Sequence, residues 1–419
     1  MNNHSVQVLP MRKRCEVINQ TLRIRLDTIL PMVMRETGFD MWLIICLEDN
    51  YDPVFLSMIP MDTWAPILQM LVFFDRGENG IERINLSRTG THDLYDVPYK
   101  VEHPDAQWGW LREVIEERNP NRIAINQGDV IWASDGLSAT LKDKLIETLP
   151  QKYASRLESG EDLCRRWFET LTDRELEIYP HVVSVAHSIQ KEIASRKYIT
   201  PGITTLEDIR WAFWQLCTDL GLELTVPFPS YKLHRSNKRK ELFGPQDDVI
   251  RRGDLVYWDV GIHYLRLHTD NAEWAYILKE GETDAPDGMK KNMEDGLRLQ
   301  DIYIGEFQQG RTGNEILRSA LEKARQEGLN NPRIYSHCTG LLLHEPGPLI
   351  GHPFEQENWT GRGDVELNYN TTFVAEVSID GIVPEWGDQI IRMPFEEQIM
   401  FTKDGVKFID GRQKSFHLV

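Results

Sequence analysis

Two aspartates, Asp259 and Asp270, stand in apolar segments that are typical of β-strands. Asp259 shares a strand face with Leu255 and Tyr257, because alternate residues of a strand point to the same side. A buried charge without a partner is strongly destabilising, so a carboxylate in this position requires a cation or a proton. Asp270 follows eleven positions later, with Gly261 in the turn region between the two segments. The spacing predicts a β-hairpin that sets two carboxylates side by side, where they would share a metal.

Three further residues complete an oxygen-rich set of candidate metal ligands. His337 lies in the segment Tyr335–Glu345, Glu376 lies in a β-branched and apolar segment, and Glu396 precedes another apolar segment. Two Asp, one His and two Glu suit Mn²⁺, Fe²⁺, Co²⁺ or Zn²⁺. Four carboxylates are more than a single catalytic metal usually takes, and they fit a carboxylate-bridged pair. The sequence therefore predicts a carboxylate-bridged pair of divalent metal ions.

The order of these ligands along the chain resembles that of the pita-bread metallopeptidases, which include methionine aminopeptidase, Xaa-Pro aminopeptidase, prolidase and creatinase. The seven-residue spacing from His337 to His344 and the Asp-Gly turn after Glu396 belong to the same pattern. The resemblance covers about the last 250 residues closely. The first 150 or so resemble, more weakly, the amino-terminal domain of the Xaa-Pro aminopeptidase and creatinase branch.

This resemblance implies an architecture of two domains. Residues 1–165 would form a creatinase-like α/β domain. Residues 166–419 would form an α+β pita-bread catalytic domain with a pseudo-twofold internal repeat. A polar stretch around residues 158–172 predicts an irregular boundary between them.

The resemblance also implies a role for each ligand. Asp259 would hold one metal, while Asp270 and Glu396 would bridge both. His337 and Glu376 would complete the shell of the other metal. A water between the metals would lose a proton near neutral pH, and the resulting hydroxide would attack the scissile carbonyl carbon. Glu376 and Glu396 are accordingly counted among the catalytic residues.

His344 matches a second histidine of the family, one that contacts the substrate near its scissile carbonyl. It would donate a hydrogen bond to the developing oxyanion, a role that needs a donor already aimed at that charge. The alternative is a core histidine, because His344 directly follows three leucines, residues 341–343. We predict a catalytic and substrate-binding role and leave the core alternative open.

Several positions depart from the family pattern, and all of them lie on the substrate side of the site. They are Leu242, Ala272, Glu273, Arg333, Val377 and Pro394. Leu242 stands where these peptidases carry a substrate-contacting histidine, and Pro394 stands where they carry an arginine. His234 and Arg392 are nearby residues of the matching types, so both are candidate substrate-binding residues. Every metal ligand is retained, which makes the metal chemistry the firmer prediction.

The first part of the chain has the pattern of an α/β domain. Residues 11–36 carry a helix-like spacing of apolar positions, and strand-like segments then alternate with helical ones. The expected strands are residues 41–47, 68–74, 81–86 and 123–126, and the expected helices are residues 108–117 and 138–149.

A repeated sequence pattern in the second part of the chain predicts two related halves. The segments Thr204–Glu207 and Thr312–Glu315 both read Thr-x-x-Glu, the capping-box pattern that satisfies free amides at a helix start. Each precedes a helix and then a hairpin that carries two of the acidic ligands. Two such copies predict two halves that close around one site.

Composition excludes several classes of partner. The formal net charge of −18 argues against nucleic acid. No apolar run approaches the roughly 20 residues that cross a bilayer, so no membrane partner is predicted. Residues 1–14 contain basic residues without a following apolar segment, which predicts no signal peptide. The five cysteines are odd in number and scattered, which indicates reduced thiols and a cytoplasmic protein.

The resulting prediction is a dinuclear-metal hydrolase of short peptides, an Xaa-Pro aminopeptidase or a prolidase-like dipeptidase. Its partners would be a small peptide and a second copy of the chain, since relatives with this layout are commonly dimers. One alternative is a pita-bread enzyme that cleaves a C–N or C–S bond of a small non-peptide metabolite. Another is a non-catalytic binding protein, which ranks last because no ligand is missing.

Overall fold

The structure is a computed structural model that describes residues 7–100, 103–226 and 229–419. The chain folds into two compact units, Leu9–Glu175 and Leu176–Val419, and residues 7 and 8 belong with the second unit. The predicted domain boundary at residue 165 falls inside helix α6 (Glu161–Glu169), ten residues before the units part. That boundary stays a prediction.

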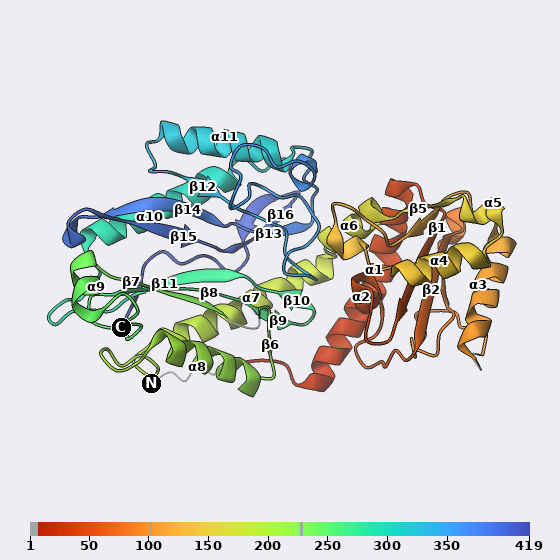
Figure 1. The fold of residues 1–419 in the computed structure, drawn as a ribbon, viewed down its shortest axis with the longest axis horizontal. Helices are drawn as coiled ribbons and strands as arrows, with labels where there is room; N and C mark the ends of the chain where they lie inside the picture. The colour runs from red at the N-terminus through yellow and green to blue at the C-terminus, as the bar shows by residue number, and fades with distance from the viewer. Residues whose placement is uncertain (1–6, 101–102, 227–228) are drawn as a thin grey trace. The chain divides into compact units, whose positions relative to one another are not determined.

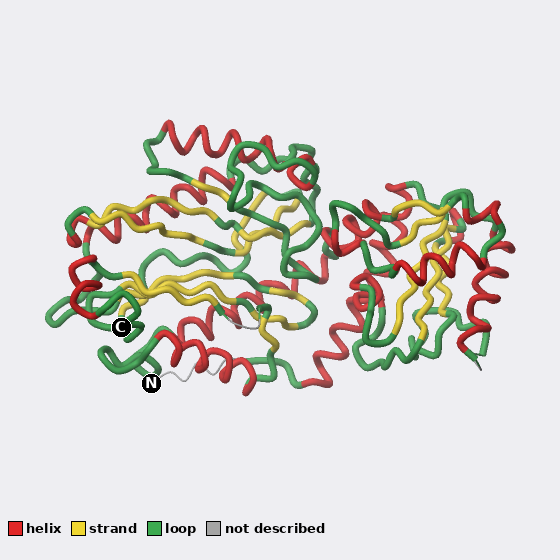
Figure 2. The backbone as a smooth tube through the Cα atoms, in the orientation of Figure 1, coloured by secondary structure: helices red, strands yellow, loops and turns green. Residues whose placement is uncertain are grey.

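The first unit is built on one mixed five-stranded sheet with the order β3-β2-β1-β4-β5 (Figures 1 and 2). Its strands are β1 (Met41–Leu47), β2 (Leu68–Asp75), β3 (Ile81–Asn85), β4 (Ile123–Ile125) and β5 (Leu157–Ser159). Its helices are α1 (Met11–Thr37), α2 (Pro53–Met58), α3 (Pro104–Arg118), α4 (Ala139–Thr148), α5 (Gln151–Ala154) and α6. Strand β1 pairs antiparallel with β2 and parallel with β4.

Helices cover both faces of this sheet because β1 is apolar at every position. Met41 and Leu43 pack in one cluster with Leu111 of α3 and Leu141 of α4. Trp42 points to the opposite face and meets Trp167 of α6 edge to face, at 6.4 Å between ring centroids. An α/β layer of the predicted kind is thus present.

The stretch predicted to be irregular, residues 158–172, instead contains α6. Leu163, Cys164, Trp167 and Phe168 recur at helical spacing and are all buried, so packing of one apolar face stabilises the helix. The polar residues that suggested a boundary occupy its other face.

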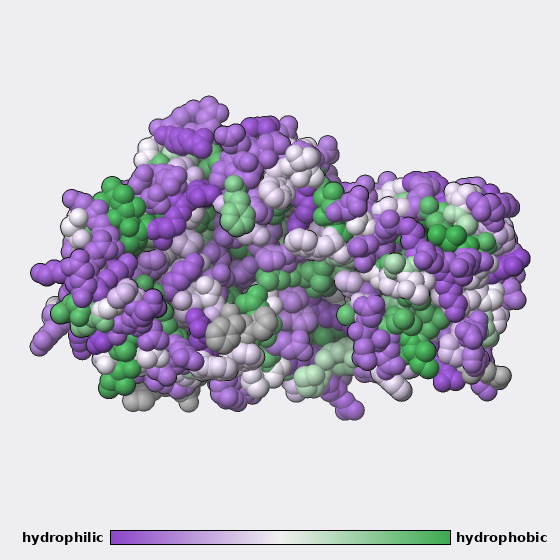
Figure 3. Space-filling view, viewed as in Figure 1, coloured by the Kyte–Doolittle hydropathy of each residue, from purple (hydrophilic) through white to green (hydrophobic). Residues whose placement is uncertain are grey.

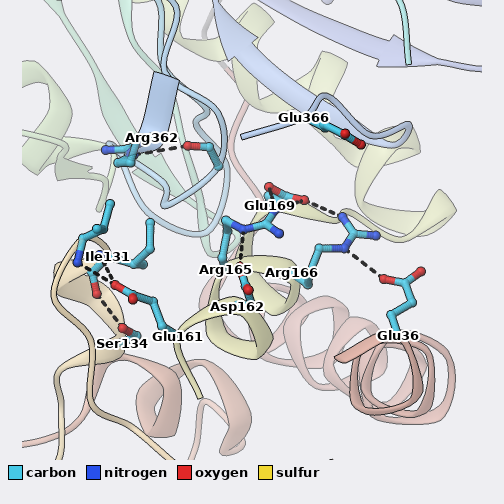
Figure 4. A network of polar contacts seen from close by, with 12 residues as sticks. Glu36, Ile131, Ser134, Glu161, Asp162, Arg165, Arg166, Glu169, Arg362 and Glu366 are labelled. Atoms are coloured by element: carbon cyan, nitrogen blue, oxygen red, sulfur yellow. Dashed lines mark hydrogen bonds and ion pairs between the residues drawn. The ribbon is translucent and has the colours of Figure 1, made fainter. Parts of the chain in front are cut away.

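Charged residues of α6 are held within the first unit by ion pairs (Figure 4). Glu169 is fully buried, and its carboxylate accepts from Arg165 at 2.9 Å and from Arg166 at 2.5 Å. Arg166 also donates to Glu36 of α1 at 2.9 Å. A buried carboxylate needs such compensation, and Arg166 in addition ties the end of α6 to α1.

The described residues of the second unit form four small sheets. Their strand orders are β18-β11-β8-β7, β12-β14-β15, β13-β16-β17 and β10-β9-β6. The strands are β6 (Glu223–Leu224), β7 (Ser230–His234), β8 (Leu255–Val260), β9 (Ile262–Tyr264), β10 (Leu267–His268), β11 (Asn271–Tyr276), β12 (Arg333–Ile334), β13 (Thr371–Val374), β14 (Val377–Val383), β15 (Gln389–Phe395), β16 (Gln398–Thr402), β17 (Gly405–Phe408) and β18 (His417–Leu418). The helices are α7 (Asp173–Ile193), α8 (Leu206–Asp219), α9 (Asn237–Phe243), α10 (Asp287–Ile304) and α11 (Gly313–Gln326). Short 3₁₀ helices lie at Gly77–Asn79, Trp132–Ser134, Arg362–Asp364 and Pro384–Trp386.

In Figure 1, α11 lies above β12, β14 and β15, α10 overlaps β14 and β15, and α8 lies below β8 and β11. The helices α10 and α11 share one apolar cluster with the strands, including Met293, Leu317 and Ile379. These two helices therefore pack on the strands through their apolar faces.

The predicted hairpin is present. Strands β8 and β11 pair antiparallel, with Val260 opposite Asn271 and Asp259 opposite Ala272. The short strands β9 and β10 occupy the connection, and its turn residues Leu265 and Arg266 both have positive φ.

One of the two predicted capping boxes is confirmed and the other is shifted. Thr312 caps α11 with Glu315 as expected. The cap of α8 is formed by Thr205 with Asp208, one residue later than the predicted Thr204 and Glu207. Thr204 is engaged elsewhere, because its hydroxyl accepts from the amide of Thr200 at 2.9 Å.

A glycine brings α10 close to β15. A Cβ built on Gly296 would lie 1.9 Å from Cε2 of Phe395, the last residue of β15. Only a residue without a side chain therefore fits here, and the helix directly supports the strand end that precedes Glu396.

The surface on the face drawn in Figure 3 is largely hydrophilic, and apolar residues form separate patches. None of the described helices combines the length and the apolar character needed to span a bilayer. All five cysteines are free thiols.

Candidate metal centre

The five predicted ligands converge at strand ends of the second unit. Together they are called here the cage: Asp259, Asp270, His337, Glu376 and Glu396. Asp259 is near the end of β8, and Asp270 directly precedes β11. Glu376 lies between β13 and β14, and Glu396 lies between β15 and β16. Backbone pairing joins these ends, since the amide of Ala272 donates to the carbonyl of Glu396 at 3.0 Å.

Asp270 is common to two groups of potential ligand atoms. Oxygens of Asp259, Asp270 and Glu396 lie within 4.8 Å of one another. Ligand atoms of Asp270, His337 and His344 lie within the same distance of one another. A carboxylate shared between two clusters is the arrangement that a bridging ligand requires.

Glu376 lies outside these two tight groups but faces the same carboxylates. Burial raises its pKa well above the usual range, and the charges of Asp270 and Asp259 raise it further. The backbone holds it beside the histidine segment, because the amide of Tyr335 donates to the carbonyl of Glu376 at 3.0 Å.

Crowding makes the negative charges of the cage unfavourable in the metal-free protein. Burial and then Asp270 raise the pKa of Asp259 to about 8. Burial raises the pKa of Asp270 to about 7. The pKa of Glu396 is also raised, by burial and by the charges of Asp259 and Glu376. Divalent cations would remove this repulsion, and the oxygen-rich donor set fits such ions.

His337 is held in the tautomer that a metal ligand needs. Its Nδ1 lies 3.0 Å from the carbonyl oxygen of Cys338, an acceptor, so Nδ1 carries the proton and donates. Its Nε2 then presents a lone pair toward Asp270, 3.4 Å from Oδ2. Burial lowers the pKa of His337 to about 4, which keeps the ring neutral.

His344 lies next to His337, with 4.5 Å between ring centroids and an interplanar angle of 85°. The residue is exposed, so the alternative of a core histidine is not realised. Partial desolvation, and then the charges of His337 and Arg362, lower the pKa of His344 to about 4. A neutral ring with one N–H is the form that can donate a hydrogen bond to substrate.

Tyr257 is a site residue that the sequence pattern did not single out. Its hydroxyl donates to Oε1 of Glu396 at 2.6 Å and so orients that carboxylate. The available signal was its position two residues before Asp259, which puts both side chains on one strand face. Lys232 of β7 also contributes, since its charge opposes the raised pKa of Asp259 that burial and Asp270 cause.

A second set of polar residues joins the positions that directly follow two cage ligands, Asp270 and Glu396. The side chain of Asn271, which follows Asp270, donates to Glu397, which follows Glu396, at 3.0 Å. His187 of α7 contacts the same carboxylate of Glu397 at 3.1 Å. No spacing or motif in the sequence links these three residues.

The two other predicted substrate-binding residues lie in different places. His234 ends β7 and packs on Trp274 at 5.4 Å between ring centroids. It is four positions along β7 from Ser230, which pairs with Asp259, and therefore roughly 13 Å along the strand from that ligand. Arg392 of β15 forms an ion pair with Asp380 at 2.9 Å and lines a pocket beside Glu376. Leu242 lies on α9 and is 73% exposed.

A model described as metallopeptidase family M24 matches residues 178–408, more than half of the chain and the part that contains the whole cage. The chain belongs to metallopeptidase family M24. The chain is therefore a metallopeptidase. Members of the family use divalent metal ions. No curated protein matches the sequence of this M24 chain.

Solved structures share the fold across nearly the whole chain. An X-Pro aminopeptidase from Thermotoga maritima is 17% identical, with a TM-score of 0.65, and the match covers 93% of this chain and 100% of that one. An Xaa-Pro dipeptidase from Bacillus anthracis is 17% identical, with a TM-score of 0.59 and coverage of 96% and 100%. A prolidase from Pyrococcus horikoshii is 16% identical, with a TM-score of 0.57 and coverage of 96% and 99%. The pita-bread fold with its amino-terminal α/β domain is thus confirmed for this M24 chain.

Proposed function

We propose that this M24 chain is a dinuclear-metal hydrolase of short peptides, acting as an Xaa-Pro aminopeptidase or a prolidase-like dipeptidase. The observation that carries the proposal is the convergence of four carboxylates and a neutral histidine from separate strand ends. The solved structures of similar fold include an X-Pro aminopeptidase, an Xaa-Pro dipeptidase and a prolidase. The cleavage of bonds next to proline is the finer part of this proposal.

The five residues of the cage would hold two divalent ions, manganese first and cobalt, iron or zinc as alternatives. When bound, such ions polarise a carbonyl oxygen and lower the pKa of a water between them toward neutrality. By resemblance to the family, Asp270 and Glu396 would be the ligands shared by both ions, and Asp270 belongs to both groups of ligand atoms.

The side chains around the metals have separate tasks in this proposal. Tyr257 donates a hydrogen bond to Oε1 of Glu396 and so holds that carboxylate in one orientation. Glu376 would accept the proton that the attacking water gives up. His344 is neutral near pH 7, and its N–H would donate to the oxyanion that develops on the substrate.

A panel of peptides with added Mn²⁺ tests this function. Ala-Pro and Xaa-Pro-Xaa peptides should be hydrolysed by the purified protein, and Glu396→Gln should reduce kcat by roughly a hundredfold or more. Glu322→Gln, at an exposed position of α11, is the matched control and should retain full activity. Bound metal together with an untouched peptide panel would contradict the proposal.

An enzyme acting on a small non-peptide metabolite is the second candidate. The exposed Leu242 favours it, because this position of α9 offers no imidazole to a peptide substrate. Metal analysis combined with the same panel separates the candidates, since the second one predicts metal binding without peptide hydrolysis. A protein free of transition metal after gentle purification would favour a binding protein instead.

The remaining predictions from the sequence belong to the same proposal. They are the domain boundary at residue 165, a homodimer and a cytoplasmic location. Sedimentation analysis of the purified protein tests the homodimer.

A further inference from the structure

His187, Glu273 and Glu397 form a second group of potential metal ligands that shares no residue with the cage. One ligand atom of each residue lies within 4.8 Å of those of the other two. Glu273 is paired with Trp258 across β8 and β11, so it points to the face of these strands opposite to that of Asp259. His187 comes from α7, and Glu397 directly follows the last cage residue. Three separate segments thus bring these side chains together apart from the cage.

The two glutamates of this group are buried and have only histidine as a cationic partner. Glu273 is 6% exposed and Glu397 is 3% exposed. The carboxylate of Glu273 lies 2.7 Å from Nε2 of His417, and that of Glu397 lies 3.1 Å from Nε2 of His187. Among the described residues, no lysine or arginine forms an ion pair with either glutamate. A buried carboxylate without a matched cation is unfavourable, and one divalent ion would neutralise both.

The hydrogen bonds of His187 present one ring nitrogen to a metal. Its Nδ1 lies 3.0 Å from Oδ2 of Asp410. When Nδ1 carries the proton and donates a hydrogen bond to Asp410, Nε2 offers a lone pair on the side of Glu397, as in carboxylate–histidine–metal arrangements. Ligands bound at about 2.0–2.2 Å to a tetrahedral zinc ion lie about 3.3–3.6 Å from one another. The 3.1 Å between Nε2 of His187 and Oε2 of Glu397 is close to that spacing.

A pocket of about 330 Å³ opens at this group. His187, Glu273 and Asp410 line it, so an ion has room for a water molecule as a further ligand. Asn271 supplies another oxygen nearby. Its Nδ2 donates to Oε2 of Glu397 at 3.0 Å, while its buried Oδ1 has no hydrogen-bond partner in the parts of the chain that the structure describes. An amide oxygen in this state is unsatisfied, and a cation would satisfy it.

Three basic residues also line the pocket, and none of them pairs with the two glutamates. They are Lys191, Arg412 and Lys414. Arg412 forms its ion pair with Asp301, at 2.8 Å. Lys191 and Lys414 are exposed, and water and salt screen their charges. The charge balance at the buried glutamates therefore depends on the histidines and on any ion that binds.

We propose that His187, Glu273 and Glu397 bind one zinc ion at a site separate from the cage. One imidazole nitrogen and two carboxylate oxygens, with water in the fourth position, form a ligand set that zinc accepts. Asp410 and His417 contact His187 and Glu273 and orient them, and groups in such positions strengthen a metal site. The ion joins α7 to β11 and to the segment between β15 and β16. This inference goes beyond the proposed function, because it assigns no step of peptide hydrolysis to the zinc ion.

Anomalous diffraction at the zinc absorption edge locates the ion. Crystals of the full chain are equilibrated at a free Zn²⁺ concentration that saturates the sites detected by equilibrium dialysis. We expect an anomalous peak between the side chains of His187, Glu273 and Glu397, whether or not zinc also fills the cage. The absence of this peak would overturn the inference.

Variants distinguish a zinc ligand from a partner in an ion pair. His187→Lys retains a positive charge beside Glu397 but offers no lone pair, and Glu273→Gln removes one negative charge. Each should bind one zinc ion fewer per chain in dialysis, because loss of a ligand should weaken the site by about a hundredfold or more, and groups that only orient a ligand already contribute 10–100-fold. Asp410→Asn should weaken it by roughly 10–100-fold. His181→Gln, at an exposed position of α7, is the matched control and should bind as many zinc ions as the wild type.

The same number and affinity of zinc ions in the wild type, His187→Lys and Glu273→Gln would also overturn the inference. The anomalous map of His187→Lys should keep any peaks in the cage and lack the peak at the second group. Both readouts are independent of peptide hydrolysis. Failure of the proposed function therefore leaves the zinc site standing, and loss of the zinc site leaves the proposed function untouched.

Discussion

At the scale of single residues, the hydroxyl of Tyr257 connects the apolar strand β8 to the last ligand of the cage. The hydrogen bond to Glu396 measures 2.6 Å and both side chains are buried. Such a bond fixes the orientation of a ligating carboxylate before the metal arrives. Its removal should therefore affect metal affinity more than folding.

Tyr257→Phe tests this role. We expect the affinity for Mn²⁺ to fall by roughly 10–100-fold, because groups that orient a ligand usually contribute that much. Titration calorimetry measures the affinity. Tyr276→Phe on β11 is the control, since it removes a tyrosine–carboxylate bond to Glu282 outside the cage. Equal losses in both variants would contradict a specific role for Tyr257.

His187 predicts a pH dependence of stability. Burial opposes its protonation, but the hydrogen bonds to Asp410 and Glu397 raise its pKa to about 10. A raised histidine pKa stabilises the fold fully below about 6.5, the value in the unfolded chain, and this stability is lost as the pH rises toward 10. The contribution is on the order of 3 kcal/mol at its maximum.

His187→Gln should remove this pH-dependent part. Urea unfolding of the metal-free protein should show a larger difference between wild type and variant at pH 6.5 than at pH 9.5. The exposed His103 offers a control, and His103→Gln should show similar small differences at both pH values. A gap for His187→Gln that is the same at both pH values would refute the assigned ion pairs.

At the scale of elements, the contact between α10 and β15 governs the strand end that carries Glu396. The helix lies so close that Phe395 occupies the space of a side chain at position 296. Helix propensity alone would favour alanine over glycine at an interior position. Packing therefore predicts that Gly296→Ala destabilises the protein, whereas helix propensity predicts that it stabilises the protein.

Gly296→Ala should destabilise the protein by about 1–3 kcal/mol, because Phe395 must move to admit the methyl group. It should also weaken Mn²⁺ binding, since Glu396 follows Phe395. Gly109→Ala in α3 is the matched control, because no atom lies within 4 Å of the Cβ built there. That variant should be more stable by about 0.5–1 kcal/mol. Denaturation midpoints and metal titration measure both, and stabilisation by Gly296→Ala would disprove the packing account.

The hairpin of the two aspartates and the helices α6 and α8 show how much of the fold could be predicted from the sequence. The hairpin of Asp259 and Asp270 was predictable because alternation and an eleven-residue spacing are local properties. The helix α6 was missed because its polar face dominates the composition, while its buried face depends on partners distant in the chain. The cap of α8 was placed one residue early, since Thr204 and Thr205 carry the same hydroxyl and only the fold selects between them.

The candidate site could be predicted from the sequence to a similar extent. The five cage residues were recognisable by type and order, and the structure brings them together. The roles of Tyr257 and Glu397 were not predictable, because each depends on which strand end lies beside which. Contacts of that kind are set by the register of strands far apart in the sequence.

At the scale of the whole molecule, metal binding should stabilise one compact unit selectively. All cage residues belong to the unit Leu176–Val419. A ligand that binds only the folded state stabilises it by about 2.7 kcal/mol at a hundredfold excess over Kd. Hydrogen exchange should therefore slow at β8, β11 and β13–β16 when Mn²⁺ is added, and exchange of β1–β5 should change little.

Asp270→Asn should make the metal-free protein more stable and should reduce the stabilisation that Mn²⁺ gives. The variant removes one carboxylate from a crowded, buried group, so the metal-free protein should become more stable by roughly 1–2 kcal/mol. Added Mn²⁺ should then raise its melting temperature far less than that of the wild type, because the shared ligand is lost. Thermal melts with and without Mn²⁺ test both expectations, and an unchanged metal effect would remove Asp270 from the ligand set.

The spread of the cage along the chain has a consequence for biosynthesis. Its ligands run from Asp259 to Glu396, so they are synthesised one after another over a long stretch of chain. A nascent chain that stops before Glu396 has the first hairpin but no closed centre, so it retains the mutual repulsion of its acids without the ions that offset it. Metal loading of the complete centre therefore has to follow the synthesis of Glu396, and metal content reports whether both halves have closed around the site.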